Sequence, residues 1–249
     1  MATQSTVTTS TLVLATITTA TTVLVLACHY WTQSKHASKD TSITPKQTLA
    51  LIRRRRSIFP KHYSTSARVD GNVLNDMLEA ATWAPSHHLT EPWHFIIFHE
   101  DHNRHLLGKF LAEQYKHVSG DSFVAKKYEK KIQNCRKASH IIGICCSLSN
   151  TNPAMEDVCS VAAAVQNMHL VATSHGVGAY WSTSGIYATN NSQNSSNKLI
   201  SLENPPALRK FLKLKDEDVC LGWMFVGPFD GKWPMGRRKP CRVQEWMSV

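Results

Sequence analysis

Residues 156–181, EDVCSVAAAVQNMHLVATSHGVGAYW, form the most regular stretch of this sequence and decide how the rest is interpreted. The segment up to His175 is dense in Ala and Val, which predicts a long helix over 156–175 that allows another backbone to pack closely against it. Gly176 and Gly178 follow, and the aromatic residues at 177–181 are typical of the start of a strand. The stretch therefore predicts a central helix that leads directly into a sheet.

Strands and helices alternate on both sides of this stretch, which places the fold in the α+β or α/β class. Asp70 is predicted to cap the helix that follows it, because carboxylates accept from free amides at helix starts. The other predicted helices are 45–56, 103–115, 125–137 and 206–212, the predicted strands are 93–99, 138–147 and 219–226, and the polar run 190–197 is predicted to be an exposed loop.

Composition limits the class of protein. The chain has 249 residues, enough for one domain with an appendage, and 42% of them are hydrophobic, enough to bury a core. Lys and Arg outnumber Asp and Glu by 28 to 18, which favours anionic partners. The seven Cys are odd in number and form no CxxC pair, so a disulfide framework is not expected. No CxxC or HExxH pattern indicates a metal, and no glycine-rich dinucleotide fingerprint is present.

The first 40 residues differ from the remainder and are assigned to a separate segment, with the folded domain at 41–249. Residues 11–28 are uncharged and just long enough to span a membrane, and positive charge follows them, which would place the domain on the cytoplasmic side. A cleaved signal or organelle-targeting peptide and a disordered tail are the alternatives. The predicted localisation is therefore membrane-anchored or organelle-targeted.

Two basic blocks lie near the ends of the domain, Arg53–Arg56 and Arg237–Lys239. Guanidinium groups make bidentate, charge-assisted hydrogen bonds to phosphate, so the two blocks could close on one phosphate group. The alternative for the first block is a solvated basic face or a polybasic stretch that binds acidic lipid.

Four motifs occur in order over about residues 45–245, and together they resemble the nitroreductase family. The resemblance implies an α+β fold with a mixed central sheet of four or five strands flanked by helices, and a homodimer with a helical interface. The motifs are Arg54-Arg55-Arg56-Ser57; Leu78-Glu79-Ala80-Ala81-x-x-Ala84-Pro85-Ser86 with Pro92-Trp93-x-Phe95; Val165-Gln166-Asn167-Met168-x-Leu170-x-Ala172 with Gly176-x-Gly178-x-x-Trp181; and Leu221-Gly222 through Val226-Gly227 with Arg238-Lys239-Pro240.

The same resemblance implies an FMN-dependent oxidoreductase. NADH or NADPH would be the electron donor, a nitroaromatic, a quinone or a similar small molecule would be the acceptor, and the two would react in a ping-pong cycle. The chemistry would reside on FMN, with no certain catalytic side chain. The residues expected to bind FMN are Arg55, Arg56, Ser57, Ser86, His87, Trp181, Ser182, Thr183, Ser184, Gly185, Arg238 and Lys239.

Two alternative functions follow from other features. Thr90-Glu91-Pro92-Trp93 resembles the iodotyrosine deiodinase branch of the family, which implies a flavin-dependent reductive dehalogenase with Glu113 and Tyr115 as candidate substrate residues. The basic blocks are also consistent with a non-catalytic module that binds membrane or nucleic acid. Nucleic acid is not the expected partner, because the aromatic residues are not interleaved with the basic ones.

Overall fold

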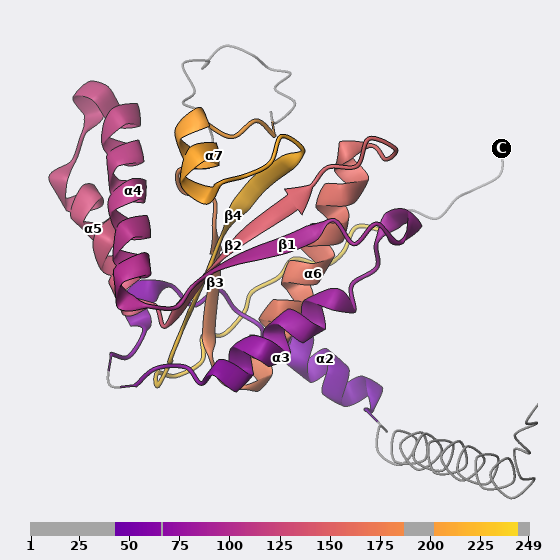
Figure 1. Cartoon of the computed structure of the whole chain (residues 1–249). Helices are drawn as coiled ribbons and strands as arrows, with labels where there is room; N and C mark the ends of the chain where they lie inside the picture. The colour runs from indigo at the N-terminus through magenta and orange to yellow at the C-terminus, as the bar shows by residue number, and fades with distance from the viewer. Residues whose placement is uncertain (1–42, 66, 187–201, 244–249) are drawn as a thin grey trace, which may run out of the picture. The chain divides into compact units, whose positions relative to one another are not determined.

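Four strands form one sheet in the computed structural model, which describes residues 43–65, 67–186 and 202–243 (Figure 1). The chain divides into a unit of Met1–Thr48 and a unit of Leu49–Val249. The strands are β1 (Trp93–Phe98), β2 (His140–Ser147), β3 (Gly178–Ser182) and β4 (Asp218–Gly227); the helices are α2 (Pro45–Arg54), α3 (Gly71–Thr82), α4 (Asp101–Ser119), α5 (Ala125–Lys137), α6 (Ala154–Ser174) and α7 (Pro206–Leu212), with short 3-10 turns η1 (Pro60–His62), η2 (His87–Leu89) and η3 (Gly120–Ser122).

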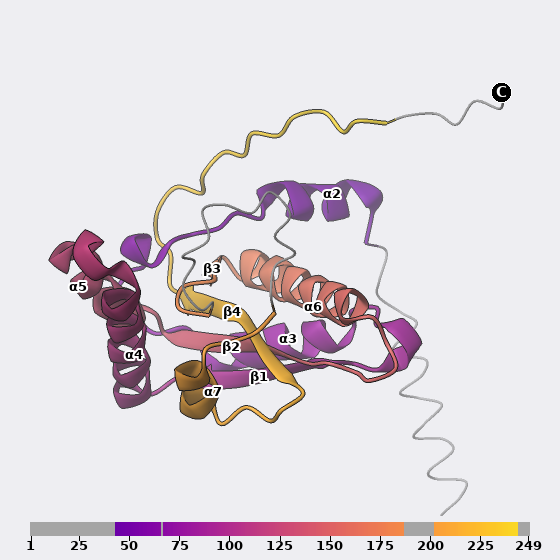
Figure 2. The same ribbon diagram turned by 90° about the horizontal axis from the view of Figure 1, so that it is seen from above.

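Helices cover both faces of the sheet, so the central strands β2 and β4 are buried along their length except at Ser147 (Figures 1 and 2). Ile142 and Ile144 of β2 pack into a cluster with α3 and α6, whereas Ile141 and Cys145 pack on the other face with α4, α5 and α7. Successive side chains of a strand point to opposite faces, which is why β2 reads as an uninterrupted hydrophobic run. The α+β class is therefore confirmed.

The strand order is β1-β2-β4-β3, and every ladder in it is antiparallel. The antiparallel pairing of β1 with β2 follows from the two helices between them. Because α4 and α5 pack against one another as a hairpin, the chain returns to the end of the sheet where β1 finished. Among the described residues the one parallel pairing is an isolated bridge between Ser57 and Ala179, so the four-stranded sheet is antiparallel and not mixed as predicted.

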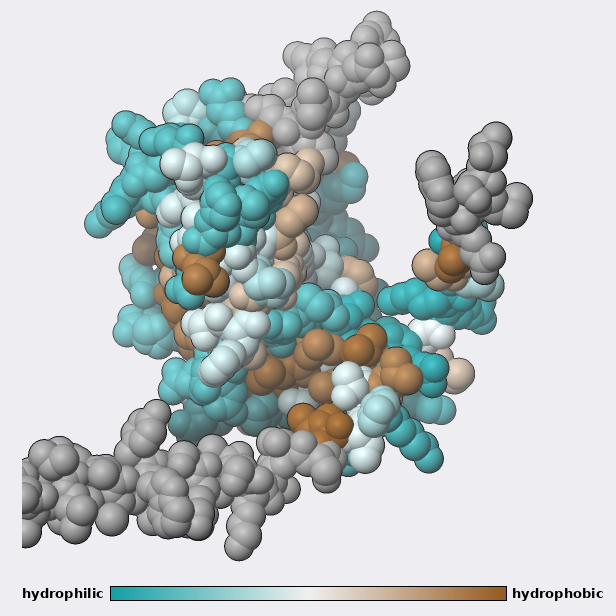
Figure 3. All heavy atoms as spheres, turned by 90° about the vertical axis from the view of Figure 1, so that its right-hand side faces the viewer, coloured by the Kyte–Doolittle hydropathy of each residue, from teal (hydrophilic) through white to brown (hydrophobic). Residues whose placement is uncertain are grey.

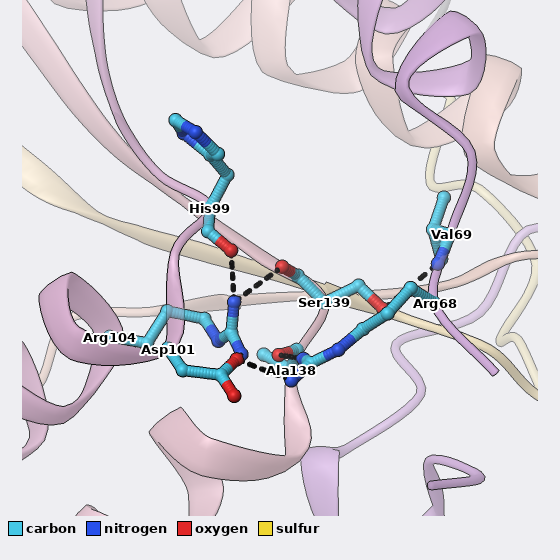
Figure 4. A network of polar contacts seen from close by, with 7 residues as sticks. All are labelled: Arg68, Val69, His99, Asp101, Arg104, Ala138 and Ser139. Atoms are coloured by element: carbon cyan, nitrogen blue, oxygen red, sulfur yellow. Dashed lines mark hydrogen bonds and ion pairs between the residues drawn. The ribbon is translucent and has the colours of Figure 1, made fainter. Parts of the chain in front are cut away.

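A buried arginine joins the start of α4 to the end of the sheet (Figure 4). The Arg104 guanidinium donates from Nη1 to the backbone oxygens of His99 and Ser139 and from Nη2 to Asp101. Arg68 donates to the same Asp101 carboxylate at 2.6 Å. Both Nη atoms of Arg104 donate hydrogen bonds, whereas its buried Nε has no partner, so the network fixes the ends of β1 and β2 against α4 through the Nη groups.

Local sequence signals account for most element boundaries. Helix α5 has the predicted bounds 125–137, and Asp70 caps α3 by accepting from the amide of Asn72 at 2.8 Å. The predicted span at 11–28 and the predicted loop at 190–197 lie outside the described residues. Within the described residues, no helix has the length and apolar character needed to cross a membrane.

Candidate functional site

The first basic block is fixed beside the sheet by backbone contacts. Helix α2 ends at Arg54, and the chain then extends so that Ser57 bridges to Ala179 of β3. The Ile58 amide donates to the Ala179 carbonyl at 3.0 Å, and the Ile58 side chain is buried. Arg55 and Arg56 are therefore held at the edge of the sheet. They lie next to β3, the strand that leads into the predicted flavin loop.

The C-terminal tail lies against this block and brings a third guanidinium to it. Burial, and after it the charges of Arg238 and Arg56, lowers the pKa of the Arg55 guanidinium. A Cβ built on Gly236 would come within 1.5 Å of Arg56 Nη2, so the tail backbone lies directly on Arg56. The two blocks that the sequence suggested could close on one phosphate are thus adjacent in space. Lys239 is exposed on the same tail.

A tryptophan holds the tail in this position. The Trp233 indole N–H donates to the carbonyl oxygen of Arg54 at 2.5 Å. The Arg54 guanidinium lies over the Trp233 ring, 5.2 Å from its centroid. Because Arg54 is used in this contact, it is Arg55 and Arg56 that remain beside Arg238.

His169 of α6 is a buried member of this cluster that the sequence analysis did not single out. Burial, and then the charge of Arg55, lowers the pKa of His169 to about 4, so the imidazole is neutral at ordinary pH. Its Nδ1 and the Nε of Arg56 are buried without a hydrogen-bond partner. His169 lies inside the third family motif, which was the one sequence signal for a role in the site. The residues around it in the sequence did not distinguish it from an ordinary core histidine.

The cluster carries positive charge that no carboxylate of the described residues offsets by an ion pair. In the part of the chain that the structure describes, Arg55, Arg56 and Arg238 form no ion pair with Asp or Glu. An unpaired donor at Arg56 Nε beside these guanidinium groups fits a multiply charged oxyanion. A phosphate would supply both the acceptor and the missing negative charge.

The loop after β3 is held in place by two indole groups. Trp181 donates to the Leu221 carbonyl at 3.1 Å, and Trp223 donates to the Ser184 carbonyl at 2.8 Å. Gly185 has a φ of +75°, and a Cβ there would lie 3.0 Å from Leu111. Glycine therefore suits this turn on grounds of both conformation and space.

This loop forms one wall of a cavity of about 510 Å³ between α4, α5, η1 and the sheet. Ser182, Ser184 and Tyr115 are the predicted site residues that line it, whereas Thr183 is exposed. Glu113 does not line the cavity, and its carboxylate accepts from the Tyr128 hydroxyl at 2.5 Å. The full lining is Phe59, Pro60, Lys61, Leu111, Tyr115, Lys127, Lys130, Lys131, Asn134, Tyr180, Ser182, Ser184 and Phe225.

Ser86 and His87 lie elsewhere in the chain. His87 Nε2 is 3.0 Å from the carboxylate of Glu156 in the first turn of α6, and Ser86 Oγ accepts from the Glu91 amide at 3.3 Å. Glu156 and His169 are 13 positions apart on α6, which at 1.5 Å per residue is about 20 Å. One chain therefore does not bring Ser86 and His87 to the arginine cluster.

Comparison with known proteins matches this chain to one protein family. The sequence model of the family described as "Nitroreductase family" matches residues 52–228. The Bacillus subtilis (strain 168) protein "Putative NAD(P)H nitroreductase YfhC" is 30% identical over 144 residues, which cover 55% of this chain and 69% of that protein.

Two solved structures are similar in fold. A nitroreductase-like family protein from Bacillus cereus has a TM-score of 0.58 at 22% identity, covering 81% of this chain and 94% of that one. An FMN-dependent nitroreductase from Clostridium difficile R20291 also has a TM-score of 0.58, at 20% identity, covering 81% of this chain and 100% of that one.

Proposed function

Because this chain belongs to the nitroreductase family, it is an oxidoreductase, and we propose that it passes electrons from NADH or NADPH through FMN to a small acceptor such as a nitroaromatic or a quinone. FMN, when bound, supplies the redox chemistry, and the protein supplies position and electrostatic field.

One observation carries this proposal: Arg55, Arg56 and Arg238 lie together, and no described Asp or Glu forms an ion pair with them. Their guanidinium groups would hold the FMN phosphate, with Ser57 as a further donor beside them. His169, neutral and buried next to Arg55, adds no competing charge to the cluster.

The loop of residues 182–185 would hold the flavin ring. Ser182 and Ser184 face the cavity, and the Ser184 backbone is fixed by Trp223. Hydroxyl and amide donors at this wall would favour negative charge on the reduced ring. The acceptor would then occupy the remaining cavity.

The test is the absorbance spectrum of the purified full chain after incubation with FMN and removal of the free cofactor. We expect the two flavin bands, and we expect them to bleach when NADH or NADPH is added without oxygen and to return on addition of a quinone. A protein that retains no FMN would contradict the proposal, and so would bound FMN that neither nucleotide reduces.

Reductive dehalogenation has weaker support, because Glu113 is engaged by Tyr128 and does not face the cavity. The non-catalytic basic module has no support beyond the basic blocks themselves, because the family match indicates an enzyme.

We also propose that the protein acts as a homodimer. The face that carries η2 and the start of α6 exposes Trp83, Leu89 and Met155, with exposed fractions of 79%, 84% and 67%. Figure 3 views the right-hand side of Figure 1, where hydrophobic residues lie among hydrophilic ones. Large exposed apolar residues in one region mark interaction surfaces. A second copy there would bring its Ser86 and His87 toward a cofactor held by the first.

Replacing Trp83 and Met155 together by Glu is expected to shift the protein from dimer to monomer in light scattering. Carboxylates placed against an apolar partner remain unsolvated, which raises the dimer dissociation constant roughly a hundredfold or more. Leu106→Glu on α4, also an exposed apolar position, is the control and should stay dimeric. A monomeric wild-type protein, or a double variant that stays dimeric, would refute this surface.

For the N-terminal segment we propose that residues 1–40 anchor or target the domain formed by 41–249, with 11–28 as the apolar part. The full chain would then remain in the membrane pellet after alkaline carbonate extraction. Recovery in the supernatant would count against an anchor.

A further inference from the structure

The cavity beside the predicted flavin loop has one basic wall. Lys127, Lys130, Lys131 and Asn134 all line it from α5. These positions are related by three, four and seven residues, so they occupy one face of the helix. The remaining lysine of the first turn, Lys126, does not line the cavity. The basic face of α5 is therefore turned toward the hollow.

The opposite walls are aromatic and apolar. Phe59 and Tyr180 pack together with ring centroids 4.5 Å apart, and Phe225 and Leu111 complete this side. A hollow of about 510 Å³ lies in the range of small-molecule sites. Its two kinds of wall together favour a ligand with a flat ring at one end and a negative group at the other.

The lysines have no anionic partner among the residues that the structure describes. Within residues 43–65, 67–186 and 202–243, none of Lys61, Lys127, Lys130 and Lys131 forms an ion pair, and the cavity lining contains no Asp or Glu. Like charges three or four positions apart on a helix repel one another. A bound anion would relieve this repulsion, so the face is prepared for a negative ligand.

Lys131, the least exposed of these lysines, joins the basic face of α5 to the predicted flavin loop of residues 182–185. Lys131 Nζ donates to Ser184 Oγ at 2.5 Å and lies 5.3 Å from the centroid of the Tyr115 ring. Lys131 is half-buried, and this burial lowers the pKa of its ammonium group. An anion held by the outer lysines would thus have its ring against the wall formed by Ser182 and Ser184.

We propose that this cavity selects aromatic electron acceptors that carry an anionic group, such as a carboxylate or a sulfonate, with Lys127 and Lys130 holding the anion. The proposal rests on the proposed function, since it names the class of acceptor for the same redox site. Lys127 and Lys130 are positioning and specificity residues and take no part in electron transfer.

The first test compares 4-nitrobenzoate with 4-nitrobenzyl alcohol, a neutral acceptor of similar size, in steady-state assays of the FMN-loaded full chain. We expect the wild type to prefer the anion. In Lys127→Gln/Lys130→Gln we expect KM for 4-nitrobenzoate to rise about tenfold while the neutral acceptor is unaffected. Lys109→Gln/Lys126→Gln removes the same charge from α4 and α5 outside the cavity, and it should leave both acceptors unchanged.

The second test measures binding without turnover. Benzoate and benzamide are titrated into the full chain by calorimetry, and we expect the preference for benzoate to disappear in the cavity variant and persist in the control. Equal binding of the two ligands to the wild type would overturn the proposal. A rise in KM for NADPH with none for 4-nitrobenzoate would also overturn it, because the lysines would then serve the donor's phosphates.

These outcomes separate the two proposals. Reduction of both acceptors with no dependence on Lys127 or Lys130 would leave the oxidoreductase function intact and refute the anionic selectivity. Benzoate binding through these lysines in a protein that retains no FMN would support the anion site and contradict the proposed redox function.

Discussion

Replacing Arg55 and Arg238 together by Ala is expected to weaken FMN binding about a hundredfold. Each guanidinium would make charge-assisted hydrogen bonds to the phosphate, worth about 1.5 kcal/mol at the lower end of their range. We use the lower end because Arg238 is exposed and its contribution is screened by solvent. The two losses sum to about 3 kcal/mol, which corresponds to the stated change in dissociation constant.

The measurement is a titration of FMN fluorescence with the full chain. Arg53→Ala/Arg237→Ala is the matched control, because it removes one exposed arginine from each of the same two blocks. Neither of these residues is among the charges that affect Arg55. The control should bind FMN as the wild type does. Equal weakening in both double variants would mean that general positive charge, and not this cluster, attracts the cofactor.

Trp223→Ala is expected to destabilise the protein by about 3–5 kcal/mol. The indole is fully buried in the cluster between the sheet and the helices α4, α5 and α7, and it donates to the Ser184 carbonyl at 2.8 Å. The substitution therefore leaves a large cavity and an unsatisfied carbonyl. Since domains have only about 5–15 kcal/mol of stability, a large share of the margin would be lost.

Urea unfolding at equilibrium measures this effect, and Trp223→Phe separates its two causes. Phe keeps most of the buried ring but cannot donate to Ser184, so it should cost only about 1–2 kcal/mol. A loss below 1 kcal/mol for Trp223→Ala would show that the indole is not a core residue. A Phe variant as unstable as the Ala variant would assign the effect to the hydrogen bond.

Much of the fold was predictable because the signals are local. The polar helix α5 could be bounded from its own residues, and Asp70 acts as a helix cap on the amide of Asn72. The run Ile141–Cys146 was recognisable as a buried strand because helices cover both faces of the sheet. The direction of strand pairing was less predictable, since the antiparallel pairing of β1 and β2 depends on how α4 and α5 pack.

The candidate site also contains residues that were predictable from the sequence and residues that depend on the tertiary fold. The sequence named Arg55, Arg56 and Arg238 because guanidinium groups suit phosphate whatever the fold. It also named Ser86 and His87, but a single chain holds these at the other end of α6. The sequence did not predict His169 as a site residue, because its spatial neighbour Arg55 is distant in the sequence.

By itself, then, the sequence determined the succession of helices and strands, the family and the chemical types of the site residues, because those follow from periodicity, caps and side-chain chemistry within a few positions. The tertiary structure alone decided which charged groups meet: the tail on Arg56, and the lysine face of α5 turned toward aromatic walls. Such contacts join segments that are distant in the chain, and they form only when the packing of the whole core fixes the direction of each face.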